Sequence, residues 1–206
     1  MRTVVRALLS ALALLLCLGA CVGEDSASPQ LPDRPGAQPL TLSEEAAALL
    51  QGADLEELAQ LLALRAPEGA TGLEATVYRL GNDLTWRKAG GGEVIGGSPE
   101  DVSGVFAMEI GPDQALSFRL HLGSAAASWG SEADPAALVG EAPVPMEILL
   151  PAFQTMELDQ EVPVALLLWG GESDLGNPTL EGYSQPALLE GAEQAQAVTL
   201  TFTSDG

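Results

Sequence analysis

Two stretches near the middle of the chain place an apolar side chain at every second position. Residues 106–110 and 116–122 both show this alternation, and the tripeptide Gly111-Pro112-Asp113 separates them. Successive side chains of a β-strand point to opposite faces, so the alternation is typical of strands with one buried and one solvated face. The sequence therefore predicts an antiparallel sheet whose apolar face must be covered by a second layer.

Further strands are predicted where short apolar or alternating runs are bounded by glycine and proline. The run 162–169 is apolar at almost every position, as expected for a central strand that is covered on both faces. The long connections 123–143 and 170–196 are predicted to be loops, or loops with one helical turn, which in the second would lie near Leu188. The remaining predicted strands are 74–80, 84–88, 146–150 and 198–203.

One predicted hairpin is specific enough to suggest which residues face each other. Gly81-Asn82-Asp83 lies between two strand-like runs and suits a turn. A three-residue loop there would place Tyr78 opposite Trp86 on one face of the sheet. The glycine-rich segments 90–92 and 96–99 are expected to be flexible connections.

The segment 41–67 shows helical rather than strand spacing. Ser43 can cap a helix with an acidic first turn, and Gly52 interrupts the pattern before it resumes. Pro67 then ends it. We expect a short helix or a helix pair packed on the domain core. The leucines at helical spacing in its second half are Leu55, Leu58, Leu61 and Leu62.

These elements predict a mainly β fold class, an antiparallel two-sheet sandwich-like domain preceded by a short helix or helix pair. The alternative is an α+β fold, in which helices cover a single antiparallel sheet. Because 47% of the residues are hydrophobic, the chain can form one core. The β-rich domain is expected over residues 68–206, after the helical segment 41–67.

The N-terminal segment is first positively charged and then apolar. Arg2 and Arg6 precede the run 7–18, which contains no charged residue. As a helix this run would rise only ~18 Å, which is too short for a hydrocarbon core of ~30 Å. The pattern instead indicates a secretory signal peptide.

The end of this segment, Leu18-Gly19-Ala20-Cys21, resembles the lipobox of bacterial lipoproteins: a branched apolar residue, two small residues and the cysteine that receives lipid. The resemblance covers residues 1–21. It implies that residues 1–20 are a signal peptide and that Cys21 becomes an N-terminus carrying diacylglycerol and further acyl chains such as palmitate. Val22, in place of aspartate, implies the outer membrane by the sorting rule of enteric bacteria.

Residues 21–40 are predicted to be the lipidated cysteine and a flexible tether, because prolines and small polar residues leave no helical or strand period. Loss of the signal reduces the 8 Lys+Arg to 6 against 29 Asp+Glu, so the mature chain has a formal charge of −23. This charge argues against nucleic acid and anionic headgroups as partners. A tether of ~25 Å also exceeds the Debye length of ~8–10 Å, so the acidic domain can lie beyond the electrostatic repulsion of the headgroups.

One predicted loop offers ligands for a metal ion. Glu172, Asp174 and Asn177 supply oxygen donors among glycines, which suits Ca²⁺. Their spacing matches no EF-hand loop, and a polar turn after a core strand is the competing interpretation. No other cofactor is predicted.

The candidate binding residues are aromatic. Trp129, Trp169 and Tyr183 could line one end of the sandwich, and packing in the core or under a loop is the competing role for each. His121, the only histidine, is expected on the polar face of its strand. A Ser-His hydrolase or a zinc site needs more than this histidine supplies, so neither is predicted.

The sequence therefore predicts a lipid-anchored cell-envelope protein of binding or structural type. Its expected partners are the membrane, through the N-terminal lipid, and an envelope protein or small ligand recognised by the loops 123–143 and 170–196. One alternative is an envelope hydrolase with a carboxylate pair, for which Glu109 and Glu147 are the candidates. A Ca²⁺-dependent adhesion module is the other. No catalytic residue is assigned.

Overall fold

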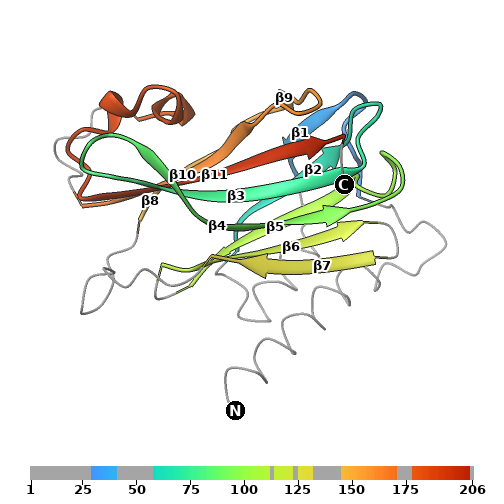
Figure 1. Cartoon of the computed structure of the whole chain (residues 1–206), viewed down its shortest axis with the longest axis horizontal. Coiled ribbons are helices and arrows are strands. Elements are labelled where there is room, and N and C mark those ends of the chain that lie inside the picture. The colour runs from blue at the N-terminus through green and yellow to red at the C-terminus, as the bar shows by residue number, and fades with distance from the viewer. Residues whose placement is uncertain are drawn as a thin grey trace, which may run out of the picture.

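The computed structural model describes residues 29–40, 58–111, 114–122, 125–131, 145–170 and 178–204. Within them the chain forms two antiparallel sheets, which lie as two layers (Figure 1). The six-stranded sheet has the order β7-β6-β5-β2-β1-β9, with β1 Gly36–Pro39, β2 Leu58–Arg65, β5 Gly104–Ile110, β6 Leu116–Leu122, β7 Ala125–Gly130 and β9 Gln154–Thr155. The five-stranded sheet has the order β4-β3-β11-β10-β8, with β3 Gly72–Leu80, β4 Trp86–Ile95, β8 Met146–Leu149, β10 Val162–Trp169 and β11 Gln194–Thr203.

The main core lies between the two sheets and consists of the side chains that point inward along each strand. Phe106 and Met108 of β5 and Phe118 of β6 are fully buried, and the Phe106 and Phe118 rings stack with centroids 5.4 Å apart. Leu200 and Phe202 of β11 meet them from the opposite sheet. Burying each such side chain contributes roughly 1.5–3 kcal/mol. The predicted mainly β fold with two antiparallel sheets is confirmed.

Strand β2 occupies part of the segment that was predicted to be helical. Leu62 and Leu64 are fully buried in the core, and Ala63 between them is also buried on the other face. Strands β1 and β5 pair with the two edges of β2. A strand covered on both faces is apolar at successive positions, so its leucines can also match helical spacing. The helical prediction is wrong over Leu58–Arg65, and residues 41–57 lie outside the described residues.

The end of the predicted tether is also a strand. β1 pairs with β2 along its length, and its first two residues, Gly36 and Ala37, also pair with β9. In the described structure the second half of β1 has β2 as its only neighbour, which suits Pro39 because proline cannot donate a ladder hydrogen bond. Arg34 lies 4.4 Å from the ring centroid of Phe153. The tether prediction is therefore wrong over β1.

The triple glycine of β4 belongs to a strand and not to a flexible connection. Gly91 has a φ of +135°, and a Cβ there would clash with the carbonyl oxygen of Ala75. At Gly92 a Cβ would meet the ring of Trp129 on β7. Because Gly92 has no side chain, the edge strands β4 and β7 of the two sheets can contact each other there. The loop predicted over 123–143 is accordingly a strand at β7.

A second apolar cluster lies on the outer face of the five-stranded sheet and is covered by two 3₁₀-helices, η1 Leu180–Tyr183 and η2 Pro186–Leu189 (Figure 1). Its side chains on β10 and β11 point away from the main core. Within the described residues, no helix has both the length and the apolar character needed to cross a membrane. We call this group the outer apolar cluster; its buried members are Leu166, Leu168, Leu189, Ala195 and Ala197.

Candidate functional site

Three side chains from different elements meet around one carboxylate on the outer face of the five-stranded sheet. Tyr78 of β3 donates its hydroxyl to Oε1 of Glu161 at 2.7 Å, and Tyr183 of η1 donates to Oε2 at 2.7 Å. Thr199 of β11 donates to Oε1 at 2.8 Å. Glu161 directly precedes β10, and the order β3-β11-β10 brings its neighbours beside it. We call these residues the tyrosine–glutamate cluster.

The charge of Glu161 is held in place but not neutralised. Its three hydrogen-bond donors are uncharged hydroxyls, and none of the ion pairs among the described residues includes it. Burial, together with Glu161, raises the pKa of Tyr78 to about 12 and raises the pKa of Tyr183 as well. Both hydroxyls therefore stay protonated at neutral pH. A carboxylate has about four acceptor positions, so a further donor can still bind.

Aromatic rings extend the site beyond the carboxylate. The Tyr78 and Tyr183 rings lie 5.8 Å apart between centroids, and Trp86 of β4 lies 5.6 Å from Tyr183. The indole Nε1 of Trp86 also donates to the backbone oxygen of Tyr183 at 2.9 Å. These contacts, with the outer apolar cluster beneath, fix η1 on the sheet. Such tilted aromatic pairs are worth about 0.5–1.5 kcal/mol beyond their buried area.

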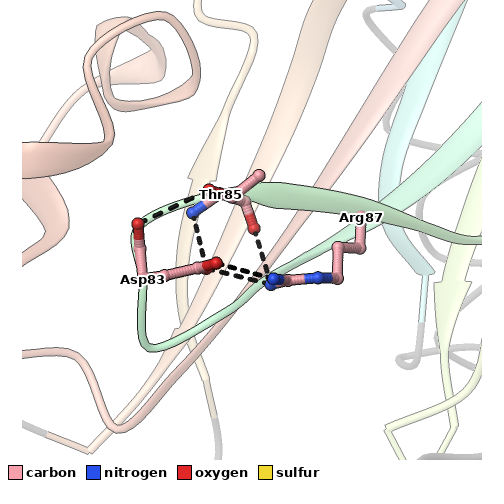
Figure 2. Close-up of polar contacts among 3 residues, drawn as sticks. All are labelled: Asp83, Thr85 and Arg87. Carbon is pink, nitrogen blue, oxygen red and sulfur yellow. Dashed lines mark hydrogen bonds and ion pairs between the residues drawn. The ribbon is translucent and has the colours of Figure 1, made fainter.

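The β3–β4 hairpin positions Trp86, and its turn is held by one aspartate (Figure 2). Oδ2 of Asp83 accepts from Nη2 of Arg87 at 2.6 Å, and Oδ1 accepts from Nη1 at 3.0 Å. Oδ1 also accepts from the backbone nitrogen of Thr85 at 3.2 Å. Two parallel bonds of this kind give an Arg–carboxylate pair a defined geometry. These bonds therefore fix the end of the turn next to Trp86, the first residue of β4.

The hairpin register differs from the predicted one. Leu80 pairs with Trp86, and Tyr78 pairs with Lys88, so the predicted pairing of Tyr78 with Trp86 is wrong. The loop is longer than three residues, because Leu84 adopts a φ of +56° inside the turn. Tyr78 and Trp86 still share the outer face, where Tyr183 lies close to both rings.

We expect Asp83 to titrate at unusually low pH. The hydrogen bonds from Arg87 lower the pKa of Asp83 to about 2. Because this folded-state pKa lies below the unfolded value of about 3.9, the stabilisation from Asp83 is present above the unfolded value and is lost as the pH falls through about 2. NMR of the side-chain carboxyl carbon should give a midpoint near the lower value. Arg87→Gln should raise it, and an ordinary midpoint in the native protein would contradict the pair.

The structure separates the three aromatic residues that were predicted to share a recognition surface. Tyr183 belongs to the tyrosine–glutamate cluster. Trp169 is only 1% exposed and lies in the main core. Trp129 packs against the edge of the same core, with its ring 6.3 Å from that of Phe118. For both tryptophans the observed packing corresponds to the competing interpretation.

The residues predicted to bind metal or lipid lie outside the described residues. These are Glu172, Asp174 and Asn177 for Ca²⁺, and Cys21 with its preceding residues 18–20 for lipid. Over the part of the chain that the structure describes, no group of three or more His, Cys, Asp or Glu could hold a metal ion. The Ca²⁺ and lipid assignments stay predictions.

The candidate carboxylates for hydrolysis lie on different sheets. Glu109 of β5 forms an ion pair of 3.0 Å with Arg119, and His121 lies on the same strand as Arg119. Burial, with a smaller effect of Arg119, lowers the pKa of His121. Glu147 lies on β8 of the other sheet, where burial raises its pKa. Glu109 and Glu147 do not form a pair.

Sequence reasoning missed the centre of the site. Glu161 has no motif around it, and Thr199 was predicted only as part of a strand. The one signal available in the sequence was the scarcity of tyrosine, because the chain has only two. In the structure both tyrosines donate to Glu161. Comparison with models of protein families, with curated proteins and with solved structures gave no match to this chain.

Proposed function

We propose that the protein is a lipid-anchored component of the bacterial cell envelope whose β-sandwich works by binding or as a structural element. The observation that carries the proposal is the sequence Leu18-Gly19-Ala20-Cys21 at the end of a charged and then apolar segment. By resemblance to bacterial lipoproteins, Cys21 would receive the lipid and the outer membrane would be the destination. Each buried CH₂ of the acyl chains contributes ~0.8 kcal/mol, so several chains anchor firmly.

The tyrosine–glutamate cluster supports a binding role for the folded domain. Its carboxylate is already oriented by three hydroxyl groups, and its rings are already packed against one another. A site that is ordered before its partner arrives loses less conformational entropy on association. We therefore place the recognition surface on the outer face of the five-stranded sheet.

The anchor is tested by Cys21→Ser, with Cys17→Ser as the matched control. The chain has only these two cysteines, and both lie in or next to the apolar run. After expression in a bacterial host, the native protein and Cys17→Ser should partition into the detergent phase on cloud-point extraction. Cys21→Ser should lose this partition, because the thiol that carries the lipid is gone.

Two further measurements complete this test. Intact-mass analysis should find an acylated N-terminus at Cys21, and membrane fractionation should place the native protein with the outer membrane. Circular dichroism of Cys21→Ser should show unchanged β content, so that its loss from the detergent phase reports the anchor and not misfolding. An unmodified thiol, or a mature start at another residue, would contradict the proposal.

A further inference from the structure

Glu161 is a carboxylate whose geometry is fixed, and no ion pair within the described part of the chain includes it. Three neutral hydroxyls orient both of its oxygens, and Glu161 itself is exposed. Charge-assisted hydrogen bonds to ammonium or guanidinium groups are roughly twice as strong as neutral ones. The arrangement therefore presents a prepared position for a positive group.

The surroundings of this carboxylate are aromatic and apolar. Tyr183, whose hydroxyl donates to Glu161, has its ring 5.6 Å from that of Trp86, and Leu188 of η2, the element that contacts η1, is 51% exposed. Trp and Tyr faces attract cations within about 6 Å of the ring centroid. The aliphatic stems of lysine and arginine also cover apolar surface while their charged ends stay in water. We call Trp86, Tyr183, Glu161 and Leu188 the aromatic face.

Charge complementarity limits what this face can receive. The chain contains no lysine or arginine after Arg119, so β8, β10, β11, η1 and η2 supply no basic side chain. Glu181 lies on η1 and Glu190 directly follows η2, and both are exposed. Strands β3 and β4 do carry basic residues, and of these Arg87 and Lys88 pair with Asp83 and Glu74. The carboxylates of Glu161, Glu181 and Glu190 therefore repel an anionic partner and attract a cationic one.

We propose that the aromatic face docks a lysine- or arginine-rich segment of a partner protein. The proposal rests on the binding role proposed above and names the partner class. One basic side chain pairs with Glu161 and lies against the Trp86 ring, and apolar residues of the segment contact Leu188. A protein segment fits better than a small amine, because charge, rings and an exposed leucine are spread over one surface and call for an extended ligand.

The test uses the full-length mature lipoprotein in nonionic detergent and a fluorescent peptide of repeated Lys-Arg-Leu triplets. Fluorescence anisotropy at physiological ionic strength measures its affinity. Glu161→Gln keeps an acceptor for the hydroxyls but removes the charge, and Trp86→Ala removes the ring. Each should weaken binding by about tenfold or more, equivalent to about 1.4 kcal/mol.

Matched controls separate docking from general attraction to an acidic protein. Glu100→Gln removes the same charge from an exposed site between β4 and β5, and Ile95→Ala removes a large hydrophobic side chain that is 60% exposed. Both should change affinity by less than about twofold. The proposal is overturned if Glu161→Gln and Glu100→Gln lose the same peptide affinity. It is also overturned if Glu161→Gln loses no affinity, or if a folded Trp86→Ala loses none.

Two further arms complete the design. If spermine competes as tightly as the peptide per positive charge, the face recognises small amines, and the proposed partner class is wrong. Thermal melts show whether each variant is folded. If Trp86→Ala is unfolded, the affinity of Glu161→Gln alone decides the test. The proposed anchor is read separately, because cloud-point partition does not depend on the peptide.

Discussion

Trp169→Ala is expected to lower the free energy of unfolding by about 3–5 kcal/mol, the usual cost of removing a large buried aromatic side chain. Trp169 ends β10, is 1% exposed and packs in the main core. Because the total stability of a domain is only about 5–15 kcal/mol, this one change removes a large fraction of it. Urea denaturation followed by circular dichroism measures the loss.

Trp169→Phe is the matched control for this prediction. The indole Nε1 of Trp169 is buried and has no hydrogen-bond partner among the described residues, so losing the indole nitrogen breaks no hydrogen bond within them. The phenylalanine variant should therefore lose much less stability than the alanine variant. If Trp169→Ala kept full stability and lost only binding of a partner, its interpretation as a core residue would be wrong.

The second large effect is expected in the alkaline titration of the two tyrosines. Burial, together with Glu161, raises the pKa of Tyr78 to about 12, and the pKa of Tyr183 is also raised. Since the chain has no other tyrosine, the native protein should show almost no tyrosinate absorbance near pH 10. The urea-unfolded chain should titrate near the ordinary value of about 10.

The same shifts make the stability fall at high pH. A folded-state pKa above the unfolded value means that the contribution is fully present below the unfolded pKa of about 10. It is lost as the pH rises through about 12 for Tyr78. Rapid pH-jump measurements should separate ionisation in the native state from unfolding.

Single variants assign the alkaline titration to the tyrosine–glutamate cluster. Tyr183→Phe leaves Tyr78 as the only tyrosine, so its absorbance change belongs to one group. Glu161→Gln should lower the pKa of both tyrosines, because it removes the negative charge that disfavours tyrosinate. If half of the native tyrosinate signal developed near pH 10, one of the two hydroxyls would not be held as the structure shows.

Much of the sandwich could be predicted because its strands alternate clearly. Phe118 and Leu120 face the core while Arg119 and His121 face outward, and this two-residue period has no helical equivalent. Strand β10 could be recognised by its length and its continuous apolar character. In both cases the local pattern and the tertiary environment indicate the same element.

The errors fall where tertiary contacts decide the structure. Leucines in β2 match helical spacing because both faces of the strand are buried, and only the pairing with β1 and β5 reveals the strand. Gly91 and Gly92 suggest flexibility in the sequence. The structure instead requires Gly91 for its positive φ and its closeness to Ala75 on β3, and Gly92 for its contact with Trp129 on β7. Tertiary packing outweighs local preference at these positions.

The candidate site could be predicted only in part, for the same reason. Tyr183 is one of three aromatic residues that the sequence predicts at one end of the sandwich, and it is the one that lies in the tyrosine–glutamate cluster. Glu161 became visible only when the order β3-β11-β10 placed Tyr78 and Thr199 beside it. A carboxylate whose partners are far away in the sequence leaves no local motif.

Strand β1 also determines how a pull from the proposed membrane anchor would reach the domain. Gly36, the first residue of the strand, is paired with Arg65 on one side and with Thr155 on the other. Tension along the N-terminal chain would therefore be divided at once between β2 and β9. Hydrogen bonds loaded together along a strand resist such a force collectively, so the point of attachment would also be a mechanical clamp.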